Sequence, residues 1–231
     1  MNIIVNGGTS GIGKEIVLVL AREKSNMILV TGRNDKILKQ LSSEGKYKNV
    51  TSVMIDLLKF EDQEKSFFTA VSSRMKSVDI LINTAGYLVV GEFMKFSNRN
   101  AREMMETNFF GPALVIKTLC PLMRKGAHIV NISSMGGYQG SAKYKGLSYY
   151  SASKAAISCL SECLAVELSD KGISVNCLAL GAVQTEMFEE AFPGLRAPVT
   201  AGEIAEFIAD FALNGNKFFN GKVLPVAVGN P

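Results

Sequence analysis

The amino end of the chain strongly restricts its fold, because an apolar run leads through a glycine-rich turn into a helical pattern. Residues 2–5 (Asn-Ile-Ile-Val) are short and rich in β-branched side chains, as is typical of a buried strand. The turn carries Gly7, Gly11 and Gly13, which let a backbone approach a phosphate without a Cβ in the way. Its helix-start amides can hold a pyrophosphate, so we expect such a site here in preference to a plain strand-to-helix turn.

The rest of the chain alternates between apolar runs and helical patterns. Further strands are expected over residues 27–31, 50–55, 78–82, 127–132, 173–178 and 223–226. Helices are expected over residues 35–43, 62–75, 99–123, 149–170 and 203–213. Strands that are continuous apolar runs indicate a parallel sheet covered on both faces. We therefore predict one α/β domain over residues 1–231, a doubly wound, seven-stranded parallel sheet with helices on both faces.

Composition limits the possible functions. The net charge is only +4, and no basic run carries interleaved aromatic residues, so we expect no nucleic-acid partner. No apolar stretch reaches membrane-spanning length and no signal peptide is recognisable, so we expect no membrane association. The four cysteines lack the spacing of a disulfide framework or metal site, which favours a reducing, cytoplasmic location and no metal. His128, the single histidine, lies too close to a strand to suit a Ser-His-Asp hydrolase.

Ligands of such sheets bind at the carboxyl ends of the strands, where the chain places several chemically useful residues. After the second strand come Gly32, Arg33 and Asn34, where an acidic residue would favour NAD. A guanidinium matches a 2′-phosphate, so we predict NADP(H) in preference to NAD(H). The alternative is a solvated arginine at the start of a helix.

Later strand ends extend this cluster. Asp56 and Leu57 follow the third strand, where we expect them to meet an adenine. Residues 83–86 (Asn-Thr-Ala-Gly) are small enough to let the backbone pass close to a cofactor. Ser133 and Ser134 end the fifth strand, as helix caps or as groups that polarise a substrate oxygen.

Tyr150 and Lys154 are four residues apart, so on a helix they lie on the same face. A neighbouring ammonium stabilises phenolate, and we expect it to lower the pKa of Tyr150 towards neutrality. A tyrosine tuned in this way can donate or accept a proton. Tyrosine and lysine four residues apart are common on surface helices, so the functional interpretation depends on the residues at the strand ends as well.

Taken together, these motifs make the chain resemble a short-chain dehydrogenase/reductase along essentially its whole length. The motifs occur in that family's order: the glycine turn, residues 83–86, Asn108, the Ser133-Ser134 pair, Tyr150 with Lys154, and the turn at residues 220–222. The resemblance implies a Rossmann-type fold. It also implies that Tyr150 is the general acid/base and that Lys154 binds the nicotinamide ribose. Ser134 would then bind the substrate carbonyl, and Asn108 would hold a water that passes protons to Lys154.

The resemblance also assigns the cofactor site. Val183 and Thr185 would contact the nicotinamide carboxamide, and Asp56 the adenine. With the strand-end residues, the predicted cofactor-binding set is Gly7, Thr9, Ser10, Gly11, Ile12, Gly13, Arg33, Asn34, Asp56, Leu57, Asn83, Ala85, Gly86, Tyr150, Lys154, Gly181, Val183 and Thr185.

The implied reaction is hydride transfer between NADP(H) and a small-molecule carbonyl or alcohol, as in a carbonyl reductase or alcohol dehydrogenase. The loops near residues 135–149 and 186–198 would border the substrate. The second loop is short and apolar, which favours an apolar or bulky substrate. Lys143 and Lys145 in the first loop either attract an anion or are solvated. The family usually forms homodimers or homotetramers through the helices that contain Asn108 and Tyr150.

The alternative to an enzyme is a noncatalytic dinucleotide-binding sensor or scaffold on the same fold. The complete set of Asn108, Ser134, Tyr150 and Lys154 favours the enzyme, because a sensor does not need proton-transfer groups.

Three local features complete the predictions. Pro112 has no N–H to return to the Asn108 carbonyl, so we expect a kink with that carbonyl free, unless Pro112 only starts a new helix. Asn6 replaces the family's usual threonine or serine, and we expect it to bond the turn backbone. Leu180 replaces the usual proline before Gly181.

Overall fold

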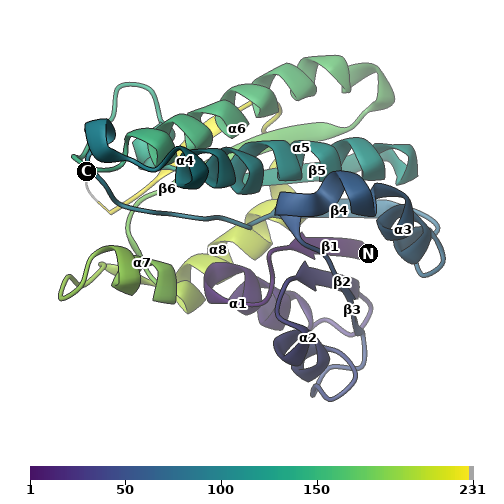
Figure 1. Cartoon of the computed structure of the whole chain (residues 1–231). Helices are drawn as coiled ribbons and strands as arrows, with labels where there is room; N and C mark the ends of the chain where they lie inside the picture. Colours follow the sequence, from purple (N-terminus) through teal and green to yellow (C-terminus); the bar gives the residue numbers. More distant parts are fainter. Residues whose placement is uncertain (229–231) are drawn as a thin grey trace.

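The computed structural model describes residues 1–228, which form a layered α/β structure around one central sheet (Figure 1). The seven strands of this sheet are all parallel, in the order β3-β2-β1-β4-β5-β6-β9. Their bounds are Asn2–Asn6 (β1), Met27–Gly32 (β2), Val50–Met54 (β3), Val78–Asn83 (β4), Met123–Ser134 (β5), Ser174–Leu180 (β6) and Val223–Val226 (β9). The predicted doubly wound, seven-stranded sheet is therefore confirmed.

Helices cover both faces of the sheet, because side chains of each strand alternate between the two faces. Ile3 and Val5 pack with α1, α2 and α8, whereas Ile4 between them packs with α3, α5 and α6. Figure 1 shows these two helical layers on opposite sides of the strands. The first layer consists of α1 (Gly11–Leu20), α2 (Asp35–Leu41) and α8 (Ala201–Asn214). The second consists of α3 (Phe60–Ser72), α5 (Gly111–Leu119) and α6 (Ser148–Glu167).

The helical stretch expected over residues 99–123 is interrupted. Helix α4 (Asn98–Met105) is followed by a π turn (Glu106–Phe110), α5 and a short 3-10 turn, and Met123 already belongs to β5. Three further elements were not predicted: α7 (Glu186–Ala191) and the two-residue strands β7 (Val183–Gln184) and β8 (Val199–Thr200). These elements are too short to show a full hydrophobic period. None of the helices within residues 1–228 is long and apolar enough to cross a bilayer.

A row of buried side-chain hydrogen bonds joins the carboxyl ends of four strands. Thr31 Oγ1 donates to Asn6 Oδ1 (3.0 Å), Asn6 Nδ2 to Asn83 Oδ1 (3.0 Å), and Asn83 Nδ2 to Asn131 Oδ1 (2.8 Å). Asn131 Nδ2 then donates to Ser161 Oγ on α6 (2.9 Å). The first four residues are register partners across β2, β1, β4 and β5. Buried amides require such partners, so this row fixes the strand ends relative to one another.

Asn6 therefore differs from its expected role. Its side chain bonds the neighbouring strands and not the backbone of the glycine turn. Thr84 takes over that task, because its hydroxyl donates to the carbonyls of Asn6 (2.9 Å) and Gly7 (3.2 Å). An amide carries a donor nitrogen and an acceptor oxygen on separate atoms, so Asn6 can bond to the strands on both sides at once.

The glycine turn packs directly against the loop that leaves β4. A Cβ built on Gly7 would lie 2.4 Å from the backbone nitrogen of Ala85, and Gly7 has a φ of +91°. A Cβ on Gly13 would lie 2.3 Å from the Gly7 carbonyl oxygen and 2.4 Å from Thr84 Oγ1. Both positions therefore require glycine.

We predict that Gly13→Ala destabilises the protein by ~1–3 kcal/mol, because the new methyl group meets backbone that cannot move aside. Gly202, in the first turn of α8, has no atom within 4 Å of an added Cβ and serves as the matched control. Gly202→Ala should be neutral or stabilising by up to ~1 kcal/mol. Urea unfolding of the two variants measures the difference, and equal stability would show that the turn is not tightly packed.

Candidate functional site

The first turn of α1 leaves its backbone N–H groups available to a ligand. Its N-cap residue, Ser10, makes no side-chain capping bond, and the first turn contains no acidic residue. Such a helix start carries unpaired donors and the positive end of the helix dipole, which together favour an anion. The tight turn at Gly7 and Gly13 lets that anion approach the backbone closely.

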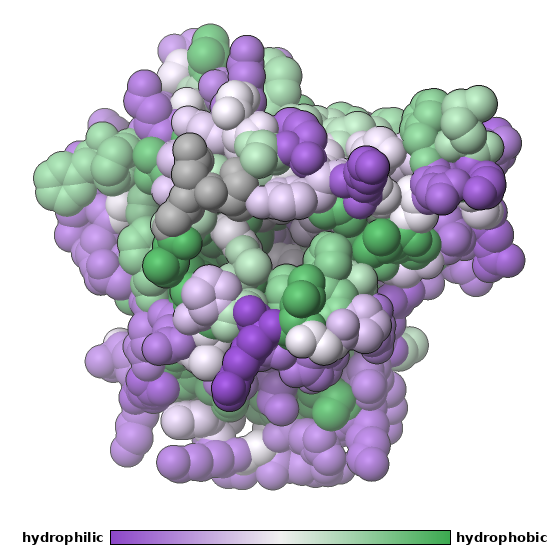
Figure 2. Space-filling model, turned by 90° about the vertical axis from the view of Figure 1, so that its left-hand side faces the viewer, coloured by the Kyte–Doolittle hydropathy of each residue, from purple (hydrophilic) through white to green (hydrophobic). Residues whose placement is uncertain are grey.

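A cavity of about 1060 Å³ opens at this end of the sheet, beside the start of α1. Figure 2 looks onto the same side of the molecule and shows a hollow with apolar side chains around it. Most of the predicted site residues line this cavity: Gly7, Thr9, Ser10, Gly11, Ile12, Gly13, Arg33, Asp56, Leu57, Ala85, Gly86, Ser134, Tyr150, Lys154, Gly181, Val183 and Thr185.

Three predicted site residues do not line the cavity. Asn34 caps α2, where its side chain accepts the Ile37 N–H (3.2 Å). Asn83 is buried in the row of strand-end hydrogen bonds. Asn108 is 1% exposed and lies behind the cavity wall, next to Thr107, which does line it. In this structure Asn34 therefore caps a helix, and Asn83 joins the side chains of neighbouring strands.

At one end of the cavity, Arg33 extends from the end of β2 with an exposed side chain. Beside it, Gly32 lies against Thr9, since a Cβ on Gly32 would be 2.5 Å from Thr9 Cγ2. Asp56 lines the same region and accepts the Leu58 N–H (3.1 Å). This end of the cavity thus presents one guanidinium and one carboxylate.

Lys154 brings a buried ammonium to the middle of the cavity. The residue is 4% exposed, and its Nζ donates to the Ile132 carbonyl (3.0 Å). Burial disfavours the charged form and lowers the pKa of Lys154 to about 8. A methyl group on Gly86 would lie 3.5 Å from Lys154 Nζ and 3.8 Å from Asn108 Oδ1, so all three residues adjoin one another.

The Tyr150 phenol behaves differently from the prediction. Burial raises the pKa of Tyr150 above its ordinary value, and a hydrogen bond with Ser134 only partly opposes this effect. The Lys154 ammonium lies 6.0 Å from the centre of the Tyr150 ring and is directed to the Ile132 carbonyl. Helical spacing correctly placed the two residues together, but desolvation outweighs the attraction that we expected to lower the pKa of Tyr150.

The π turn holds Asn108 where it can clamp a loop beside the site. Asn108 Oδ1 accepts the Tyr87 N–H (2.7 Å), while Nδ2 donates to the Tyr87 carbonyl (2.9 Å) and to Ser153 Oγ (2.9 Å). Its side chain is thus fully used within the protein. Pro112 is the second residue of α5, which starts immediately after the π turn, so the regular α-helical pattern is interrupted where we expected a kink. The free Asn108 carbonyl stays a prediction.

Of the two neighbouring serines, Ser134 is the better placed to meet a substrate. The Ser133 hydroxyl is buried, donates to the Lys154 carbonyl (2.7 Å) and accepts from Ser158 (2.8 Å). Ser134 Oγ accepts the Gly136 N–H (3.2 Å), and a hydrogen bond between Ser134 and Tyr150 acts to lower the pKa of the phenol. Ser133 therefore supports α6, and Ser134 has a hydroxyl to offer into the cavity.

The other end of the cavity is largely apolar. The loops after β4 and β5 border it on one side, and α7 with the segment after it borders it on the other. A hydrogen bond from the Gly91 N–H to the Gly146 carbonyl (3.0 Å) joins the two loops. Lining side chains here are Tyr87, Leu88, Met135, Tyr144, Leu147, Met187, Phe188, Phe192 and Leu195. Leu147 belongs to the loop that we expected to border the substrate, whereas Tyr87 and Leu88 were not predicted. Their positions beside Gly86 were the available signal.

The two loop lysines have different surroundings. Lys143 Nζ donates to the Tyr138 carbonyl (2.7 Å) and to Ser141 Oγ (2.7 Å), so it binds its own loop. Lys145 is exposed and lines the cavity, as does Glu190 from α7. Of the two, only Lys145 adds charge to the cavity wall.

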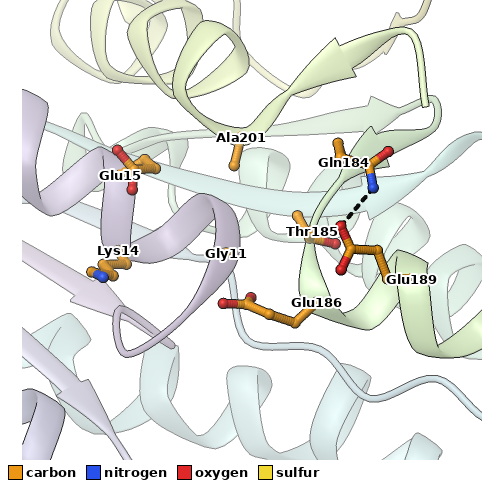
Figure 3. A pocket seen from close by; sticks show the side chains of 8 residues that line it. All are labelled: Gly11, Lys14, Glu15, Gln184, Thr185, Glu186, Glu189 and Ala201. Atoms are coloured by element: carbon orange, nitrogen blue, oxygen red, sulfur yellow. Dashed lines mark hydrogen bonds between the residues drawn. The ribbon is translucent and has the colours of Figure 1, made fainter. Parts of the chain in front are cut away.

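A smaller hollow of about 240 Å³ lies on the other side of the start of α1 (Figure 3). Lys14 and Glu15 of α1 line it together with Gln184, Glu186 and Glu189. Gln184 Nε2 donates to Glu189 Oε1 (2.7 Å). Glu186 also lines the large cavity and therefore lies at the boundary between the two.

Known proteins share this sequence pattern. A family model described as short chain dehydrogenase matches residues 1–195. Dehydrogenase/reductase SDR family member FEY of Arabidopsis thaliana is 32% identical over 210 residues, covering 81% of this chain and 55% of that protein. SDR family member 7B of Danio rerio is 33% identical over 201 residues, covering 83% and 64%. This chain thus spans less than two thirds of the length of these two relatives.

Solved structures share the fold. The structure titled "ElxO with NADP Bound" superposes with a TM-score of 0.84 at 25% identity, covering 98% of this chain and 96% of that one. A dehydrogenase/reductase from Sinorhizobium meliloti 1021 gives a TM-score of 0.83 at 26% identity, covering 98% and 93%. The family match, the similar relatives and the shared fold all indicate the same family. The chain therefore belongs to the short-chain dehydrogenase/reductase family of oxidoreductases.

Proposed function

We propose that the protein is an NADP(H)-dependent carbonyl reductase or alcohol dehydrogenase with Tyr150 as its general acid/base. One observation carries the proposal: Ser134, Tyr150 and Lys154 line the same cavity as the uncapped start of α1. A site for an anionic nucleotide and a proton-transfer group thus share one space. That arrangement suits a reaction in which a hydride and a proton reach the same C=O bond.

The residues fit a nicotinamide dinucleotide. A Cβ at Gly7 would meet Ala85 and one at Gly13 would meet the Gly7 carbonyl and Thr84, so the turn is tight, and the α1 amides are left for a pyrophosphate. Arg33 would hold a 2′-phosphate, and Asp56 would lie beside the adenine. Lys154 would bind the nicotinamide ribose, with Val183 and Thr185 beside the carboxamide. When bound, the nicotinamide supplies or accepts the hydride.

Tyr150, Ser134 and Lys154 would handle the proton. With its raised pKa, Tyr150 is a neutral phenol at physiological pH and can give its proton to a carbonyl oxygen during reduction. The Ser134 hydroxyl would donate a hydrogen bond to the same oxygen. The Lys154 ammonium, with a pKa of about 8, is mostly charged at pH 7 and would stabilise the phenolate that is left.

The apolar end of the cavity favours a bulky, apolar carbonyl compound or alcohol as the substrate. Aromatic and aliphatic side chains from three loops surround it, and Lys145 with Glu190 are the charged residues there. Burial of an apolar substrate against such a wall is favourable by ~25 cal/mol per Å² of surface. The loops at residues 135–149 and 186–198 would thus select the substrate.

Other sequence predictions stay predictions. A homodimer or homotetramer would use the helical stretch around Asn108 together with α6, whose outer side exposes Cys159, Cys163 and Val166. The single-domain organisation, the cytoplasmic location and the lack of nucleic-acid partners also await direct tests.

Tyr150→Phe should lower turnover by ~10²–10⁴-fold, because the acid/base group is lost while the ring remains. The dissociation constant for NADPH should change little. Tyr149→Phe is the matched control, since the Tyr149 ring stacks on Phe93 and Phe96 and does not line the cavity. NADPH oxidation with a panel of ketones and aldehydes measures both variants. Turnover retained in Tyr150→Phe would remove Tyr150 from its role.

Arg33→Gln should weaken NADPH binding by ~10–100-fold and leave NADH binding unchanged, because only the 2′-phosphate is affected. Arg22→Gln is the control, as Arg22 is an exposed arginine that pairs with Glu206 on α8. Calorimetric titration with each nucleotide gives the affinities. If wild-type protein bound NADH and NADPH equally well, Arg33 would not be the selecting group.

The buried Lys154 should make stability depend on pH. Its folded pKa of about 8 lies below the ordinary 10.5, so between these values the unfolded chain binds more protons. Stability of the protein without cofactor should therefore rise by ~2 kcal/mol between pH 7.5 and 9.5 through this group. Lys154→Met should lack that rise, as urea unfolding at both pH values would show. Parallel pH dependence in the two proteins would contradict a buried ammonium.

A further inference from the structure

Glu186 is the first residue of α7 and immediately follows Thr185. Its carboxylate extends from α7 towards the start of α1 (Figure 3). A methyl group built on Gly11 would lie 3.9 Å from Glu186 Oε2. The side chain is exposed and faces both the large cavity and the small hollow.

Within residues 1–228, Glu186 makes no side-chain hydrogen bond or ion pair. Glu189, three residues later on α7, accepts a hydrogen bond from Gln184 and so is held in place. Both carboxylates lie in the first turn of α7, and both line the small hollow. They differ in that only Glu186 also lines the large cavity.

The position of Glu186 matters because of what it faces. The first turn of α1 has no capping side chain and no acidic residue of its own, so the Glu186 carboxylate is the negative group beside its positive end. The proposed cofactor would bring its pyrophosphate to the same helix start. Like charges a few ångströms apart repel, more strongly in a cavity than in bulk water.

The small hollow offers the carboxylate another place. Lys14 of α1 lines the small hollow but not the large cavity, and the carboxylates of Glu15 and Glu189 line this hollow as well. A Glu186 side chain that turned into the small hollow would move away from the pyrophosphate and towards this ammonium. The backbone of α7 would not have to move for this change.

We propose that the Glu186 carboxylate is displaced by the cofactor pyrophosphate and thereby weakens cofactor binding and speeds release. The inference rests on the proposed function, because it needs a dinucleotide at the start of α1. Glu186 acts on affinity alone and takes no part in the proton or hydride steps. Because Glu186 begins the segment that would border the substrate, the position of that segment's first side chain would depend on whether the nucleotide site is occupied.

The test is a charge series, Glu186→Gln and Glu186→Lys, with Glu189→Gln as the matched control. Calorimetric titration with NADPH in 20 mM salt should show ~3–10-fold tighter binding for Glu186→Gln, with Lys tighter than Gln. The gain should shrink in 0.5 M salt, because salt screens exposed charges. Stopped-flow release of NADPH should slow by a similar factor. Glu189→Gln should stay within ~2-fold of wild type, since a glutamine can still accept from Gln184.

Two results would overturn the inference in distinguishable ways. If wild-type protein binds NADPH but the Glu186 variants bind equally or more weakly at both salt concentrations, Glu186 does not oppose the cofactor and the proposed function stands. If wild type and all variants bind neither NADPH nor NADH, the proposed function fails and this inference fails with it. A purely structural role in α7 would affect Glu186→Gln and Glu189→Gln alike, without grading by charge.

Discussion

The close packing of the glycine turn against the loop after β4 is the constraint on which the site depends. A Cβ at Gly7 would meet the Ala85 backbone, and one at Gly13 would meet the Gly7 carbonyl and Thr84 Oγ1. This contact sets the turn against Ala85, and the next residue, Gly86, adjoins Lys154 and Asn108. The row of amide hydrogen bonds through Asn6, Asn83 and Asn131 fixes the ends of the strands relative to one another. A nucleotide site and a proton-transfer site thereby share one cavity.

Burial sets the electrostatics of that cavity. It raises the pKa of Tyr150 and lowers the pKa of Lys154. The phenol therefore stays neutral, and the ammonium loses its proton more readily than in water. Both pKa shifts favour the neutral form of the side chain in the protein without a cofactor. A phenolate formed during reaction would sit near the ammonium, and the two charges would then stabilise each other. The pair is thus arranged for the charge that the reaction creates.

Much of the fold follows from sequence pattern because buried parallel strands are continuous apolar runs. All seven strands lie within a few residues of their expected ranges, and β9 matches its range of residues 223–226. Features that depend on tertiary contacts could not be predicted in the same way. The π turn at Asn108 and the two-strand role of Asn6 both require knowledge of neighbouring elements. Helix α7, which begins at Glu186, has only six residues, so its sequence shows no helical period of apolar side chains.

The candidate site shows the same division. Motif spacing placed Ser134, Tyr150 and Lys154 at one cavity, because strand ends and helix faces fix where side chains start. The lowered pKa that this spacing predicted for Tyr150 was wrong, because the shift depends on burial and on where the Lys154 ammonium points. Asn34 and Asn83 look like ligand contacts by position, yet their side chains are used in a helix cap and in the amide row.

The most direct test of the account follows a labelled hydride. The protein is incubated with NADPH that carries deuterium at both hydrogen positions of nicotinamide C4 and with a panel of bulky apolar ketones and aldehydes, and the products are examined by mass spectrometry. The account predicts alcohols with one deuterium on the carbinol carbon, formed in step with NADPH consumption. Tight NADPH binding with no labelled alcohol from any compound of a broad panel would contradict it and favour a dinucleotide sensor.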